Sequence, residues 1–228
     1  PEDNLATRKL YEKAIELDPD YARAYAGLAW THLQEAQTSG SEEAHERALT
    51  CARKGVRIKP ASHSNYLTLG WVCLGSGLTD QAVAAIERGI ELNPNDADGL
   101  GMLAHALCMQ GKPDEAIARF DEATRMNPLN RPYRNAMAGI AHFVARRYRE
   151  TVEAVEGLDD PDPWVISWYA AALVHVGREE DAKKMIAEYR RHAPAHLIAS
   201  QLRGFKHEAD CEHYVEAMHK AGFEEAED

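Results

Sequence analysis

The sequence has little positive charge relative to its negative charge. Its 26 Lys and Arg residues stand against 37 Asp and Glu residues, so the net charge at pH 7 is −11. Nucleic acids and anionic membrane surfaces attract proteins through basic patches. The charge balance therefore argues against a nucleic-acid partner and against a membrane partner.

Long apolar runs and paired cysteines are also missing. The most apolar stretch, residues 164–177, is shorter than the roughly 20 residues of a membrane-spanning helix. Residues 1–20 are polar and acidic, which does not fit a signal peptide. The four cysteines are scattered without the spacing of a disulfide framework. Together these absences predict a cytoplasmic protein with reduced thiols.

Sequence motifs of catalysis are absent as well. The chain has no phosphate-binding loop, no nucleophile elbow and no His-Glu-x-x-His helix. Acidic pairs such as Glu42-Glu43 fall in the first turns of predicted helices, where they offset the helix dipole. His207, Cys211 and His213 lack the spacing of a zinc motif. We therefore expect no enzyme activity, no cofactor and no metal site.

The sequence does contain an internal repeat. Residues 65–94 and 99–128 align with a period of 34 residues, and Leu69 falls on Leu103. A period in this range is typical of stacked repeats, in which each helix pair buries its apolar faces only against its neighbours. The period predicts an all-α fold built from antiparallel helix pairs.

The repeat extends over most of the chain. Units end near prolines, because the residue before a proline is driven out of the helical region. Pro19 and Pro60 are 41 residues apart, seven more than the period, so this helical hairpin should be longer than the others. Residues 1–195 are predicted to form a solenoid and residues 196–228 a C-terminal helical cap. The solenoid divides into the second helix of a truncated repeat and five units: 4–18, 20–60, 61–94, 95–128, 129–162 and 163–194.

Small residues recur where helices should approach closely. Gly70 lies in a first helix, and Ala82 and Ala116 lie in second helices. Packed helix axes are roughly 8–10 Å apart, which leaves no room for large side chains at the contact. Larger residues such as Ile86 and Phe120 should fill the space between units.

The turns and helix starts are marked too. Gly77 and Gly111 fall between the helices of their units, where a turn favours glycine. Thr79 is predicted to be an N-cap, and Pro113 suits a first helical turn.

This pattern resembles the tetratricopeptide repeat. The matching residues are Tyr66, Leu69, Gly70, Ala82, Ile86 and Pro94 in one unit, and Leu100, Leu103, Ala104, Ala116, Phe120, Ala123 and Pro128 in the next. The resemblance implies a right-handed superhelical solenoid that is a non-catalytic scaffold. Its partner would be a protein, peptide or helix bound in a concave groove lined by the first helices.

The groove positions of that family, carried over to this sequence, define a predicted partner-binding groove. They are Arg23, Trp30, Leu33, Leu67, Trp71, Asp98, His105, Met109, Tyr133, Ile140, Phe143, Trp164 and His175. Aromatic and Met side chains in a groove suit an apolar peptide or helix. Core or inter-repeat packing explains Trp30 and Trp71 equally well and is favoured for Trp164, so both interpretations stay open. Arg23 is the only basic predicted residue, which argues against the Lys, Arg and Asn ladder that clamps a C-terminal carboxylate in some relatives.

A narrower resemblance concerns three segments. Residues 2–33, 93–98 and 205–223 are similar to the C-terminal repeat region of bacterial class III adenylate/guanylate cyclases. This implies a regulatory segment of a larger bacterial signalling protein, which binds a partner or its own upstream domain. The start at Pro1, in the middle of a repeat, fits such a piece. One alternative is a free-standing scaffold that self-associates, for example as a homodimer. The other is the sensor region of a winged-helix transcription regulator.

Overall fold

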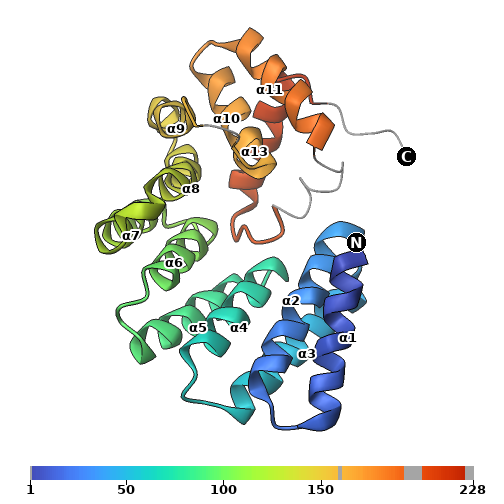
Figure 1. Cartoon of the computed structure of the whole chain (residues 1–228). Coiled ribbons are helices and arrows are strands. Elements are labelled where there is room, and N and C mark those ends of the chain that lie inside the picture. Colours follow the sequence, from blue (N-terminus) through green and yellow to red (C-terminus); the bar gives the residue numbers. More distant parts are fainter. Residues whose placement is uncertain (1, 159–160, 193–201, 224–228) are drawn as a thin grey trace. The chain divides into compact units, whose positions relative to one another are not determined.

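The computed structural model describes residues 2–158, 161–192 and 202–223, which form helices joined by short connections (Figure 1). These residues contain twelve α-helices and one 3-10 turn, and no strand, which confirms the predicted all-α fold. The chain forms two compact units, Pro1–Met102 and Leu103–Asp228.

The first unit holds α1 (Glu2–Leu17), α2 (Ala22–Ser39), α3 (Glu42–Ile58), α4 (His63–Gly75) and α5 (Thr79–Leu92), and α6 (Ala97–Met109) begins in it. The second unit holds α7 (Pro113–Met126), η1 (Pro128–Asn130), α8 (Arg131–Val144), α9 (Tyr148–Val155), α10 (Pro163–His175), α11 (Glu179–His192) and α13 (Glu208–Lys220). Consecutive helices pair as predicted: α2 with α3, α4 with α5, α8 with α9, and α10 with α11.

The hairpin of α2 and α3 is longer than the others, as the proline spacing predicts. The helices have 18 and 17 residues, against 13 and 14 in the pair α4 and α5. Gly40 ends α2 in the left-handed conformation at φ 68°, and the Ser41 hydroxyl then caps α3 by accepting the Ala44 N–H at 3.2 Å. The loop between the two helices is therefore only two residues long, and the extra residues lengthen the helices.

The core of the first unit is built from small residues and a few large ones. One cluster consists of Ala29, Leu33, Ala48, Ala52 and Val72, with Leu49, Cys51, Leu69 and Trp71 packed against it. The contact between α4 and α5 requires glycine, because a Cβ on Gly70 would collide with the Ile86 side chain. That Cβ would also lie 3.1 Å from the Ala82 carbonyl oxygen. The close approach predicted at Gly70 is confirmed.

The core of the second unit is aromatic, and α13 supplies part of it. Trp168 of α10 and Tyr214 of α13 are at most 1% exposed, and their ring centroids are 3.9 Å apart. Phe143 of α8 packs on Trp168 at 5.3 Å. The predicted helix near the C-terminus is confirmed, and it packs against α10 (Figure 1). The first part of the predicted cap, residues 196–201, lies outside the described residues.

The turn predictions hold and one cap prediction is wrong. Gly77 and Gly111 adopt positive φ angles of 76° and 84°, and Pro113 occupies the first turn of α7. The cap position of α5 belongs to Leu78, and Thr79 is the first helical residue. Thr79 is 5% exposed, so it is a buried residue of the first turn. Among the helices that the structure describes, none is both long and apolar enough to cross a membrane.

Candidate functional site

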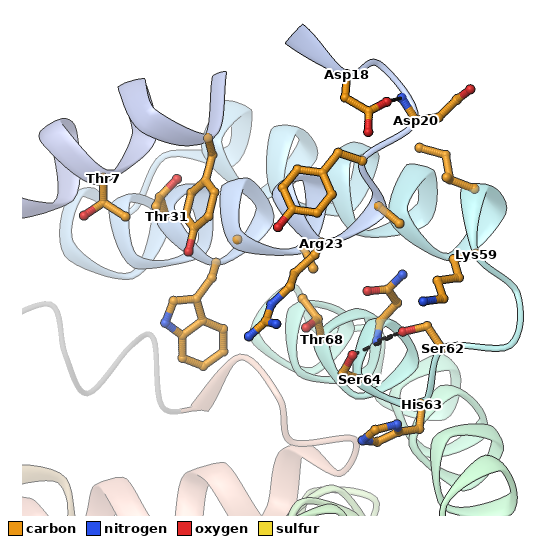
Figure 2. A pocket seen from close by; sticks show the side chains of 18 of the residues that line it. Thr7, Asp18, Asp20, Arg23, Thr31, Lys59, Ser62, His63, Ser64 and Thr68 are labelled. Carbon is orange, nitrogen blue, oxygen red and sulfur yellow. Dashed lines mark hydrogen bonds between the residues drawn. The ribbon is translucent and has the colours of Figure 1, made fainter. Parts of the chain in front are cut away.

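A large hollow lies in the first unit. It has a volume of about 1420 Å³ and is lined by α1, α2, the end of α3 and the start of α4 (Figure 2). Its polar lining includes hydroxyl groups from Thr7, Ser62, Ser64 and Thr68. The hollow is therefore a mixed surface, with aromatic, hydroxyl and charged groups on different helices.

One side of α2 forms the longest wall of the hollow. Arg23, Gly27, Trp30 and Gln34 are three or four positions apart, so they share one side of the helix. The Tyr11 ring of α1 lies against Gly27, where a Cβ would collide with it. Glycine at this position therefore allows Tyr11 to reach the hollow.

Trp30 is the exposed aromatic group of this wall. Its side chain is 43% exposed, and its ring centroid lies 6.4 Å from that of Trp71. Trp71 is half-buried and packs on the core of the first unit. The core thus supports Trp30 from one side, while the rest of the indole faces solvent.

Two cations of the hollow are free to bind a ligand. Arg23 and Lys59 are exposed, and their side chains pair with no residue that the structure describes. Figure 2 shows Arg23 pointing into the hollow and away from Asp18 and Asp20. The Asp18 carboxylate accepts the Asp20 N–H at 3.1 Å. His63, which also lines the hollow, lies 3.8 Å from the Asp96 carboxylate.

The structure brings only part of the predicted groove into this hollow. Arg23 and Trp30 line it. The other predicted residues of the first unit do not: Leu33 is buried, Leu67 and Trp71 are half-buried, and Asp98 is exposed.

In the second unit, the chain's own C-terminal segment covers predicted groove positions. The Lys206 N–H donates to the Met109 carbonyl oxygen at 2.9 Å. The His213 ring of α13 lies 4.7 Å from the His175 ring and 5.4 Å from the Phe143 ring, centroid to centroid. Burial, with the charge of a neighbouring arginine and the ring of His175, lowers the pKa of His213 to about 4. These positions serve an intramolecular contact.

The remaining predicted residues of this unit are divided between core and surface. His105 is 6% exposed and its ring centroid lies 4.9 Å from that of Trp164, which is half-buried. Burial lowers the pKa of His105 to about 4. Ile140 is 1% exposed and Tyr133 is 54% exposed.

Five predicted groove residues therefore do not reach an open surface. They are Leu33, His105, Met109, Ile140 and Phe143. Their side chains fill space within or between helix pairs, which is the packing role that periodic apolar residues usually have. The structure places these five positions in the core, and the partner-binding role of the predicted groove stays a prediction.

Sequence reasoning missed Tyr11 and Lys59. Tyr11 lies on α1, which the sequence assigned to the second helix of a truncated repeat, and Lys59 follows the end of α3, so both lie outside the first helices. A usable signal for Tyr11 was Gly27, a small residue in the middle of α2 that marks the close approach of another side chain.

The histidines and cysteine near the C-terminus do not assemble a metal centre. Within residues 2–158, 161–192 and 202–223, no three His, Cys, Asp or Glu side chains lie close enough to hold a metal ion. His207 packs against Gly111, and the His213 Nε2 lies 2.9 Å from the Tyr148 hydroxyl. Both imidazoles therefore have structural neighbours.

Two stretches of the sequence, residues 10–46 and 73–140, match the tetratricopeptide repeat family. The chain is similar to anaphase-promoting complex subunit 3 of Schizosaccharomyces pombe, with 35% identity over 89 residues, which are 39% of this chain and 12% of that protein. It is also similar to small glutamine-rich tetratricopeptide repeat-containing protein 2 of Mycosarcoma maydis. That match has 30% identity and covers 40% of this chain and 24% of the relative. The chain thus spans a quarter or less of each relative's length.

Solved structures share the fold. A chain of the APC/C hetero-tetramer Cut9-Hcn1 superposes with a TM-score of 0.68 at 18% identity, over 95% of this chain and 40% of that one. A tetratricopeptide repeat protein from Parabacteroides merdae superposes with a TM-score of 0.64 at 13% identity, over 97% of this chain and 86% of that one. At such identities the likeness concerns the arrangement of helices alone.

Proposed function

We propose that this chain, a tetratricopeptide repeat protein, binds a peptide segment of another protein in the hollow of its first unit. The observation that carries the proposal is Trp30, whose indole is 43% exposed on the wall of that hollow. Exposed tryptophans supported by well-packed neighbours are frequent anchors of protein interfaces.

The size and lining of the hollow favour a peptide over a small molecule. Its volume of about 1420 Å³ exceeds the roughly 300–1,000 Å³ of a typical small-molecule site. Hydroxyl groups on α1 and α4 offer hydrogen bonds along its length, as an extended main chain requires. The predicted groove positions of the second unit, by contrast, are partly covered by α13 and adjoining residues.

Selection from a phage-displayed library of random 12-residue peptides, with the full chain as bait, tests the proposal. We expect Trp30→Ala to weaken the selected peptides about tenfold or more, since a central aromatic anchor contributes about 2 kcal/mol. Leu10→Ala is the matched control, because Leu10 is 72% exposed in the same unit and does not line the hollow. Selected peptides that bind Trp30→Ala as tightly as the original chain would contradict the proposal.

The wider context of this binding stays a prediction. We propose that the chain is a regulatory segment of a larger bacterial signalling protein such as a nucleotide cyclase, on the strength of the resemblance at residues 2–33, 93–98 and 205–223. Self-association and the sensor role in a winged-helix regulator are the alternatives. The composition of the hollow supports peptide binding in each of these settings.

A further inference from the structure

The geometry of the hollow indicates which peptide it binds. We propose that the peptide carries an acidic residue three positions away from an aromatic residue or a proline. This inference rests on the proposed function and specifies the partner of the same site. The proposed occupant of the hollow is an extended segment of another protein that carries this pair of residues.

The spacing follows from two residues of α2. Arg23 and Trp30 are seven positions apart, which is about two turns and roughly 10 Å along the helix axis. A peptide in the extended polyproline II conformation advances about 3.1 Å per residue with three residues per turn, so it covers this distance in about three residues and points residues i and i+3 to the same side. A peptide that lies along α2 therefore meets both side chains with residues i and i+3.

Arg23 is placed where helix stability does not explain it. It lies in the first turn of α2, where the helix dipole disfavours a cation. Its exposed side chain pairs with no residue in the described part of the chain. A guanidinium of this kind suits the two oxygens of a carboxylate.

The other charged groups of the hollow leave Arg23 available. Lys59 is unpaired among the described residues and adds a second positive charge. Asp18 and Asp20 lie at the junction before α2, and Figure 2 shows both on the side opposite to the Arg23 guanidinium. His63 is directed at Asp96, which lines no part of the hollow. The lining of the hollow thus holds two cations and two carboxylates, and the two carboxylates lie away from the Arg23 guanidinium.

Trp30 supplies the second point of recognition. Its exposed indole offers a flat apolar surface, on which aromatic rings and prolines pack well. A carboxylate alone would compete poorly with water at so open a site, because exposed ion pairs contribute little. The two contacts together give the peptide both affinity and register.

The test uses the full chain and designed ten-residue peptides, with binding measured by calorimetry. One peptide has Asp at position 4 and Trp at position 7, a second has these two reversed, and each has a counterpart with Lys in place of Asp. We expect at least one Asp peptide to bind about tenfold more tightly than its Lys counterpart, because like charges repel across an interface. In Arg23→Glu this preference should reverse.

Arg57→Glu is the matched control, since it makes the same charge change on an exposed residue of α3 outside the hollow. It should leave the preference for Asp in place. The inference is overturned if no designed peptide prefers Asp, or if Arg23→Glu and Arg57→Glu behave alike. Peptides that depend on Trp30 but ignore the charge at position 23 would refute the acidic residue and leave the proposed function intact.

Discussion

His105 shows how one buried side chain couples the fold to pH. It is 6% exposed beside Trp164, and burial lowers its pKa from 6.5 to about 4. As the pH falls, the unfolded chain takes up this proton near pH 6.5, while the folded chain takes it up only near pH 4. The free energy of unfolding therefore decreases between these values, by up to about 1.4 kcal/mol per pH unit for this group.

We predict that His105→Phe makes the free energy of unfolding less dependent on pH between 4 and 6.5. Phenylalanine keeps an aromatic ring beside Trp164 but cannot bind a proton. Urea unfolding at several pH values measures the slope for both chains. An unchanged slope would mean that His105 is not buried in its neutral form.

Residue positions within one helix illustrate what periodicity can and cannot predict. Trp30 and Leu33 are three positions apart on α2, and both were predicted to face a groove, yet one is 43% exposed and the other 1%. Spacing identifies which side of a helix a residue occupies. Whether another element covers that side depends on residues far away in the sequence, and the repeat pattern does not contain that information.

At the scale of elements, α7 shows how tightly the helix pairs are packed. Ala116 is fully buried in this helix, and Ala118, two positions later, is exposed. The sequence correctly predicted that Ala116 lies at a close helix contact, because such contacts impose a steric limit that recurs in every unit.

We predict that Ala116→Trp destabilises the protein by about 1–3 kcal/mol or more through overpacking. Ala118→Trp is the control on the same helix, and it should change the melting temperature little. Both substitutions place a tryptophan in the same helix, so the comparison of the two thermal melts separates the effect of burial from that of helix propensity. Equal melting temperatures would count against the packing described for α7.

Helix ends are predicted less well than helix contacts. The glycine turns at Gly77 and Gly111 were identified because their backbone conformation favours one residue type. The cap of α5 was predicted at Thr79, one residue after its position at Leu78, because a threonine can serve as a cap or as a buried first-turn residue. Only its burial decides between these roles.

At the scale of the molecule, each unit has its own core, and α13 completes that of the second. Tyr214 of α13 is fully buried against Trp168. The sequence predicted a C-terminal helix but not that it would cover groove positions of its own chain. The 34-residue period ends before α13, so nothing in the repeat specifies where this helix packs.

We predict that Tyr214→Ala destabilises the second unit by about 3–5 kcal/mol, the range for removing a large aromatic side chain from a core. Hydrogen exchange should become faster in α8, α10 and α13, while α2 to α5 keep their protection. Tyr133→Ala, at a tyrosine that is 54% exposed in the same unit, should have little effect. Faster exchange across both units would show that they unfold together.

The long hairpin of α2 and α3 indicates which changes in repeat length evolution can accept. Its additional residues extend two antiparallel helices, by five residues (18 against 13) and by three (17 against 14), with a loop of only two residues. Both helices are lengthened at the ends that meet in the loop, so the parts that pack on the neighbouring helices keep their orientation. A single inserted residue would rotate everything beyond it by about 100° and expose part of the core. Insertions and deletions in such a chain should therefore be tolerated at hairpin tips and be deleterious within a helix.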